Sequence, residues 1–496
     1  MHIKLLELLR SLPENELLQL DKFVATPFFN DSERVKNLYI FIRQFAPTFD
    51  TPKLTDESAF QYVFPERNFD AALQHKLQSQ LFKLSEAFLA HRQLMRRPFE
   101  RDLYVLQFYQ EALLSRHVES TLQRLDKQLM HKSVPQIQEI RQRLDLEAAR
   151  AEWLAKTDKR TGDINLEKLN QTLDDWFLIN KLAYLNSMLG RQKIVKVRYE
   201  LTWLSEILQR LENIDYQRIP AIEIYREILF LQLHPGEPVH YHRLKALLEE
   251  YTPNFLPEEL RQFYIYLENA AKHIFPITSY FQELFTLYQY QSDTGILYEN
   301  GSLSHAVFQN VVNAALALQA FDWAAQFIQA NQQRIIPAAY RADCYVQNLA
   351  ALHFFQGDFD EAQHLLLQSN PIDIYYKLSQ KMLLAKIYFE KRELEVLENF
   401  LATFTKFIFD QQTKIAPEKV ASYRLFVNFF KKLLRILSIS PDSITTFEYQ
   451  QPQMDASIVQ QLLRLQKQVE KAPVFYSKSW LLHCIGAQYS SLDDKV

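Results

Sequence analysis

Glycine is scarce in this chain, and this scarcity limits the folds that the sequence can adopt. Only 7 of the 496 residues are glycine, and no two of them lie closer than six residues apart. Dinucleotide-binding loops, phosphate-binding loops and strand–turn–helix serine elbows all need more closely spaced glycines. Helix interiors, in contrast, disfavour glycine by about 1 kcal/mol per residue. The composition therefore argues against the common nucleotide-binding folds and favours helices.

Helical periodicity runs through nearly the whole chain, and signals for helix starts recur. Thr55 and Asp70 each precede apolar residues at helical spacing, as N-caps do, and Pro220 and Pro257 stand at the start of amphipathic runs. No segment shows a convincing strand-like alternation. Apolar residues make up 48% of the chain, enough for a large core. We therefore predict an all-α fold of about twenty helices.

A short pattern recurs in the C-terminal half. Phe321–Ala324, Phe359–Ala362 and Leu394–Leu397 each follow one helix-like segment and open another, and their starts lie 38 and 35 residues apart. Near-constant spacing of this size is typical of stacked helix pairs, because one pair cannot bury its own apolar face. The pattern predicts an array of antiparallel helix pairs.

The middle copy, residues 345–362, resembles a tetratricopeptide repeat. Leu349 and Ala350 match the family's apolar-then-small pair in the first helix, Gly357 stands at the turn, and Ala362 matches the small residue at the helix crossing. The resemblance implies an α-solenoid in which the first helix of each pair lines a concave groove. Helical arrays of this kind are usually binding scaffolds.

The flanking copies depart from the family pattern at two positions. Gln319 and Arg392 stand where Gly357 stands in the middle copy, and Leu397 replaces Ala362 in the third. The spacings also exceed the family's usual length of about 34 residues. We therefore expect lengthened turns between the pairs.

The resemblance also implies which residues line the groove and hold a protein or peptide segment. Carried over by position, they are Gln309, Asn313, Gln347, Asn348, Ala351, Phe354, Phe355, Met382, Lys386 and Phe389. Asn313 and Asn348 resemble the asparagines with which some family members hold a peptide carboxylate. They fall at different repeat positions, however, and asparagines that bond to neighbouring helices are the alternative that we favour.

The whole chain also resembles a group of helical proteins from Bacteroidetes bacteria. The stretches that carry this resemblance are Thr26–Asn30, Phe308–Val312, Asp322–Trp323 with Phe327–Ile328, and Asp373 with Tyr375–Leu378. The group has no activity that can be carried over, so the resemblance implies a fold and a source only.

Two other functional hypotheses come from local clusters. A helix predicted over residues 70–97 ends in Arg92, Arg96 and Arg97, and a shorter predicted helix precedes it. A DNA-binding helix-turn-helix has the same order of a short helix, a turn and a longer basic helix. The leucines of this helix are expected to pack in a core, however, and positive charge at the C-terminal end of a helix is also favoured by the helix dipole. A nucleic-acid-associated regulator that uses this basic helix is the first alternative to a binding scaffold.

The second alternative is a metal-dependent enzyme. Residues 234–242 hold His234, His240 and His242 with Glu237, the densest group of potential zinc ligands in the chain. On a helix, side chains two residues apart diverge, so we favour a turn that leads into a helix. No nucleophile with a nearby base is evident, and we predict a non-catalytic protein without cofactors.

Charge and cysteine content place limits on location and partners. The net charge of −3 gives no general attraction to nucleic acid or anionic lipid, and two cysteines are typical of a reducing compartment. We find no secretory signal and no membrane-spanning run, so we expect a cytoplasmic protein. We divide it into an N-terminal helical module (1–100), a middle helical array (101–300), the repeats (301–437) and a C-terminal helical cap (438–496).

Overall fold

The computed structural model describes residues 2–129, 137–157, 163–192, 197–213, 219–438 and 456–493. The described residues are almost entirely helical, which confirms the all-α prediction. The chain divides into two compact units: Met1–Tyr184 with Trp203–Ile222, and Leu185–Thr202 with Glu223–Val496. The four-part division stays a prediction, and its last boundary, at residue 438, borders residues 439–455, which lie outside the described residues.

Two apolar cores lie in the part of the first unit that the structure describes. One is built from buried residues between Leu5 and Phe88, and the other from residues between Phe99 and Trp153. The helices that supply the unit are α1 (Ile3–Arg10), α2 (Glu14–Ala25), α3 (Glu33–Arg43), α4 (Asp56–Val63), α5 (Ala71–Met95), α6 (Pro98–Glu111), α7 (Ser115–Leu129), α8 (Ile137–Thr157), the first part of α9 (Leu166–Gln192), α10 (Leu204–Asn213) and the start of α11 (Pro220–Leu233).

The second unit is longer and holds the predicted repeats. Two two-residue strands, β1 (Leu303–Ser304) and β2 (Ile335–Ile336), pair in parallel within it. Besides the rest of α9 and α11, its helices are α12 (Pro238–Tyr251), α13 (Pro257–Ile274), α14 (Ile277–Asp293), α15 (His305–Ala317), α16 (Phe321–Asn331), α17 (Arg341–Gln356), α18 (Phe359–Gln368), α19 (Ile374–Glu390), α20 (Leu394–Gln411), α21 (Pro417–Ser438), α22 (Ala456–Lys471) and α23 (Lys478–Asp493), and its 3₁₀ turns are η1 (Thr252–Asn254), η2 (Gln332–Arg334), η3 (Ala338–Tyr340) and η4 (Gln412–Lys414).

Local signals placed several helix starts correctly. The Thr55 hydroxyl accepts a hydrogen bond from the Ser58 amide at the start of α4, and the Asp70 carboxylate accepts one from the Ala72 amide at the start of α5. Such bonds satisfy backbone donors that have no partner inside the helix. Proline opens α11 and α13 as predicted, where the missing N–H costs nothing.

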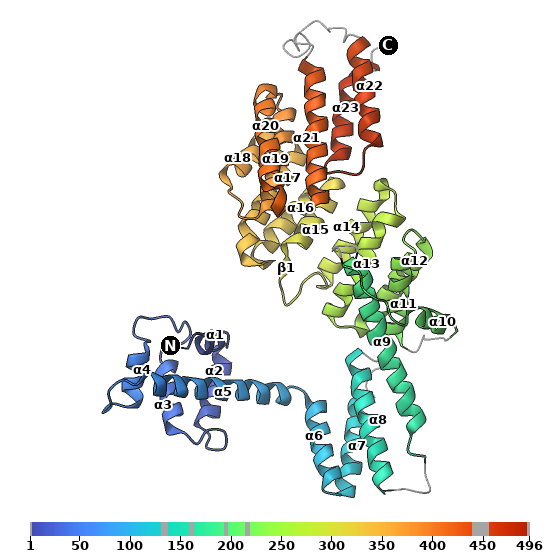
Figure 1. Ribbon diagram of the computed structural model, residues 1–496. Coiled ribbons are helices and arrows are strands. Elements are labelled where there is room, and N and C mark those ends of the chain that lie inside the picture. Colours follow the sequence, from blue (N-terminus) through green and yellow to red (C-terminus); the bar gives the residue numbers. More distant parts are fainter. Residues whose placement is uncertain are drawn as a thin grey trace. The chain divides into compact units, whose positions relative to one another are not determined.

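Three helix pairs follow one another from α15 to α20. The second helices, α16, α18 and α20, begin at Phe321, Phe359 and Leu394, the three positions that the sequence pattern marks. Helix α17 contacts its own partner α18, the preceding pair α15 and α16, and the next first helix, α19 (Figure 1). Each pair therefore packs against the next in chain order.

The same backbone turn ends the first helix of each pair. Gln319, Gly357 and Arg392 all adopt positive φ, at 57°, 84° and 61°. In each turn the next amide donates to a carbonyl five residues back: Ala320 to Ala315 at 3.0 Å, Asp358 to His353 at 2.9 Å, and Glu393 to Tyr388 at 2.9 Å. This is the Schellman cap, which satisfies helix carbonyls that would otherwise have no partner.

Residues at the predicted helix crossings are inaccessible to solvent. Ala324 and Ala362, each in the first turn of its second helix, are 0% exposed, and so is Leu397 in the third copy. Close approach of two helices requires little side chain at the contact. The Leu397 crossing shows that a larger side chain is accommodated in the third pair.

The shared turn makes a stability prediction. Gly357→Ala should lower the free energy of unfolding by about 1 kcal/mol, because a left-handed backbone strains any side chain, even though no atom lies within 4 Å of an added Cβ. Arg392→Gly should raise the free energy of unfolding by up to about 1 kcal/mol, because it relieves that strain. Urea denaturation measures both, with Gln356→Ala as the neighbouring control. Equal stability of Gly357→Ala and the wild type would contradict the role of this turn.

Candidate functional site

Three helices carry the predicted binding residues. α15, α17 and α19 are the first helices of successive pairs, and α17 contacts both of the others. Residues four apart lie on one stripe of a helix, so Gln347, Ala351 and Phe355 share one side of α17. Gln309 and Asn313 follow the same spacing on α15. We call the surface formed by the ten predicted residues the first-helix face.

The ten predicted residues differ widely in exposure. Asn313 is exposed, and Phe355 is 49% exposed. The partly buried residues are Gln309, Ala351, Met382 and Lys386. The buried residues are Gln347, Asn348, Phe354 and Phe389. A buried side chain cannot contact a partner without rearrangement, so only part of the first-helix face is accessible.

Asn348 is committed to its own helix. Its side-chain amide donates to the Cys344 carbonyl at 2.8 Å and lies 3.6 Å from the Cys344 sulfur, and the residue is 2% exposed. Its amide nitrogen is therefore not directed at an incoming peptide. This placement agrees with the alternative in which the asparagine has a structural role, although the bond runs within α17 and not to a neighbouring helix.

A polar seam links the three first helices beside Asn348. The Cys344 thiol of α17 donates to the His305 carbonyl of α15 at 3.6 Å, and His305 Nδ1 lies 2.9 Å from the Tyr376 hydroxyl of α19. Cysteine, histidine and asparagine together can form a nucleophilic site. Burial raises the pKa of the Cys344 thiol to about 11, however, which keeps it protonated near neutral pH. The seam is therefore suited to holding the helices in register.

The other end of the first-helix face is covered by α23. The Trp480 indole N–H donates to Glu390 Oε1 at 3.3 Å, and its ring lies 5.9 Å from the ring of Phe389. Lys386 Nζ lies 5.2 Å from the Trp480 ring, within cation–π range. The Ser477 hydroxyl, just before α23, contacts the Met382 sulfur at 3.6 Å. The chain's own C-terminal helix thus occupies the third-repeat part of the face.

Lys386 is held in an unusual environment for a lysine. It lies between the rings of Phe354 and Trp480, at 5.9 and 5.2 Å, and makes no ion pair with any described residue. Burial lowers the pKa of Lys386 to about 8, against an ordinary 10.5, and the nearby Cys484 and Glu390 side chains partly oppose the shift. A lysine kept in an apolar site at a cost in stability is a candidate functional residue.

The lowered pKa predicts a pH-dependent effect of Lys386→Met. Below pH 8 the folded and unfolded chains both carry the charge, so its burial reduces stability and the variant should be more stable than the wild type. Between about pH 8 and 10.5 the unfolded chain keeps a proton that the folded chain has lost, so wild-type stability gains relative to the variant as pH rises. Urea denaturation at pH 7 and pH 9.5 measures the difference, with the exposed Lys406→Met as control. A pH-independent difference would contradict this placement of Lys386.

Sequence reasoning missed the residues that fix this face. His305 follows the N-cap Ser304 directly and is the first residue of α15. Tyr376 is the third residue of α19. Their helix positions were predictable, but their contacts join residues 71 apart. Trp480 lies 90 residues from Glu390, and no local sequence pattern predicts the contact between them.

The histidine cluster converges only in part: His234 Nδ1 lies 3.9 Å and His240 Nε2 lies 3.7 Å from the Glu237 carboxylate. His240 and His242 both lie on α12, as the helical alternative predicts, and His240 Nδ1 lies 2.8 Å from Glu227 Oε2 of α11. His242 instead lies edge-on to Phe275, with the ring centroids 6.3 Å apart. Within the described residues, no three His, Cys, Asp or Glu side chains are placed to hold a metal ion.

Two of the three arginines of the proposed DNA-binding helix serve an internal contact. Arg92 of α5 and Arg96, the residue that follows α5, both bind the carboxylate of Glu16 on α2, Arg96 at 3.2 Å, and the Glu16 side chain is 10% exposed. Arg97 is the residue before α6. Neutralising Arg92 would leave a mostly buried carboxylate with one fewer partner, so these arginines stabilise the N-terminal core.

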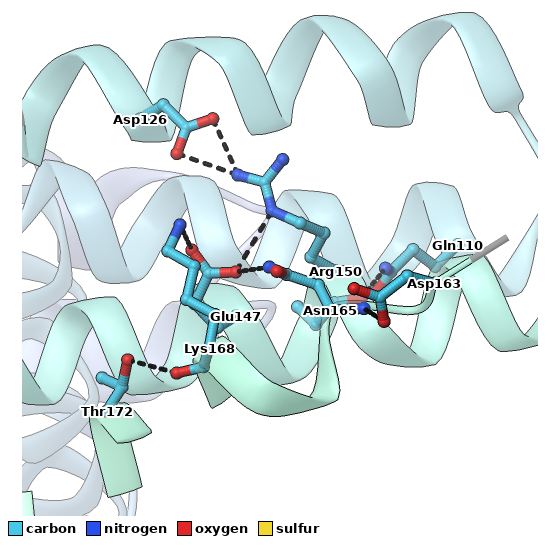
Figure 2. Close-up of polar contacts among 9 residues, drawn as sticks. Gln110, Asp126, Glu147, Arg150, Asp163, Asn165, Lys168 and Thr172 are labelled. Carbon is cyan, nitrogen blue, oxygen red and sulfur yellow. Dashed lines mark hydrogen bonds and ion pairs between the residues drawn. The ribbon is translucent and has the colours of Figure 1, made fainter. Parts of the chain in front are cut away.

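Glu147 of α8 is a carboxylate in the first unit with several polar partners (Figure 2). Its side chain is 5% exposed and receives Lys168 Nζ at 2.5 Å and Asn165 Nδ2 at 2.7 Å. Arg150 lies 3.5 Å from Glu147 and also binds both carboxylate oxygens of Asp126 on α7. Each labelled side chain has a protein partner, although Arg150 Nε makes only the 3.5 Å ion pair with Glu147 and no hydrogen bond. The cluster therefore joins α7, α8 and α9.

Glu147→Ala should therefore lower the free energy of unfolding by about 1–3 kcal/mol, because it leaves Lys168 and Asn165 without their buried acceptor. Thermal or urea unfolding measures the loss. Glu152→Ala, at an exposed position on the same helix, is the matched control and should stay within about 0.5 kcal/mol of the wild type. Equal effects of the two changes would show that the cluster does not support the fold.

No protein family, curated protein or solved structure matches this chain. The resemblances drawn from the sequence therefore stay predictions. None of the described helices combines the length and the apolar character that crossing a bilayer requires.

Proposed function

We propose that the protein is a non-catalytic helical-repeat scaffold that binds a protein or peptide segment on the first-helix face. The observation that carries this proposal is the contact between α23 and one end of that face. Trp480 inserts between Lys386 and the aromatic rings of Phe389 and Phe430, with its N–H bonded to Glu390. A helix with an aromatic anchor is therefore chemically suited to this kind of surface.

The accessible part of the face lies on α15 and α17. Asn313 and Phe355 are its exposed residues, and Gln309 and Ala351 are partly buried beside them. An exposed aromatic side chain supplies contact area at low entropic cost, and the two amides can bond to a peptide backbone. Three stacked pairs with the same cap support a tetratricopeptide-like solenoid, in which first helices form the binding side.

The cellular setting is part of the same proposal. Cys344 and Cys484 are both free and buried, which fits a reducing compartment. We place the protein in the cytoplasm, where a partner would carry an exposed apolar or aromatic segment.

Phe355→Ala tests the proposal. If Phe355 anchors a partner, truncating it should weaken binding by about 2 kcal/mol, or roughly 30-fold, while the melting temperature stays unchanged because the residue is half exposed. Partners recovered by tagged protein from a native bacterial lysate can be identified, and their affinity for each purified variant then measured.

Leu367→Ala is the matched control, since Leu367 is 61% exposed but lies on α18, a second helix. A photo-crosslinking residue at position 313 should label the same partner. Equal affinity of Phe355→Ala and Leu367→Ala, with no crosslink from position 313, would rule out this face.

A further inference from the structure

A cavity of about 300 Å³ lies between α21 and α22. These two helices contact each other and, with α23, form the C-terminal end of the second unit (Figure 1). The cavity is lined by Lys432, Arg435, Ile436, Gln461, Arg464, Leu465 and Gln468. The site is open to solvent, and three cations and two amides line it together with two apolar side chains; no acidic side chain is among its described lining residues.

Neither arginine of this cavity has an acidic partner among the described residues, and both side chains are exposed to solvent. Arg435 and Arg464 make no hydrogen bond or ion pair with a described residue, and Lys432 Nζ bonds only to the neutral Gln468 Oε1, at 2.9 Å. Elsewhere Arg150 and Arg261 each bind a carboxylate. The chain carries a net charge of −3, so acids are not in short supply.

Local charge repulsion accompanies this arrangement. Burial lowers the pKa of Lys431, and the charge of Arg435 lowers it further. Helix α21 carries no acidic residue after Glu418. The helix dipole favours a cation in the last turn of α21, which accounts for Arg435. It does not account for Arg464, which faces the same cavity from the middle of α22.

We propose that this cavity binds a small organic anion with two or more phosphate or carboxylate groups. The guanidinium forks of Arg435 and Arg464 match the oxygens of such groups, and Lys432 adds a third positive charge. Gln461 and Gln468 supply neutral donors, while Ile436 and Leu465 contact the carbon skeleton. The volume lies at the lower end of the range for small-ligand pockets, about 300–1,000 Å³.

This site is independent of the first-helix face, because none of its lining residues belongs to α15, α17 or α19. If this protein binds a peptide but no anion, only the anion proposal fails. If it binds an anion but no peptide, only the proposed function fails. Binding at one site can be measured with the other disabled by substitution.

Isothermal titration of the full chain with pyrophosphate and with citrate, at low salt, tests the proposal. We expect saturable binding of at least one probe, weakened about tenfold or more by Arg435→Gln and by Arg464→Gln, since hydrogen bonds to charged groups contribute at that level. Pyrophosphate alone would identify a phosphate ligand, and citrate alone a carboxylate ligand. Without probe, both variants should melt at or above the wild-type temperature, because each change relieves repulsion.

Arg424→Gln is the matched control, because Arg424 lies on α21 outside the cavity and bonds to Gln412 at 2.8 Å. It should leave probe binding unchanged. The proposal is overturned if neither probe binds at millimolar concentration. It is also overturned if Arg424→Gln weakens binding as much as the cavity variants, or if only an acidic peptide such as polyglutamate binds.

Discussion

The helix pairs from α15 to α20 depend on one backbone constraint, the left-handed turn that ends each first helix. The turn directs the second helix back along the first. The amide that follows each left-handed residue donates to a carbonyl in the last turn of the first helix, a carbonyl that would otherwise have no partner within the helix. Gly357 meets the constraint without strain, but Gln319 and Arg392 have side chains there. Since a left-handed residue other than glycine costs about 1–2 kcal/mol, packing at the buried Ala324 and Leu397 must offset that cost.

This constraint explains which parts of the fold the sequence could predict. Phe321, Phe359 and Leu394 follow the turn closely and carry a local signal, so the starts of α16, α18 and α20 were found. The same turn occurs between α6 and α7, where Leu113 has a φ of 54° and the Leu114 amide donates to the Tyr109 carbonyl at 2.9 Å. No glycine marks this turn, so the sequence carries no signal for it.

The candidate site was predictable to a lesser degree, for a related reason. Helical spacing assigned the predicted residues to α15, α17 and α19, but burial depends on what lies across from each side chain. Asn348 is enclosed by the seam of Cys344 and its neighbours, and Lys386 by the Trp480 ring, which comes from far along the chain. Periodicity identifies a stripe on a helix and says nothing about a cover supplied by a distant segment.

Charged side chains in this molecule fall into two groups: those with partners inside the fold, and those without an acidic partner among the described residues. Glu16, Glu147 and Glu227 are buried carboxylates that each receive two or more partners, so folding satisfies them completely. Arg435 and Arg464 face a cavity with no carboxylate among its described lining residues, whereas Arg150 and Arg261 are paired with acids. These cations are exposed, so solvent screens the repulsion between them. The anion proposed for this site would supply the negative charge that its described lining residues lack.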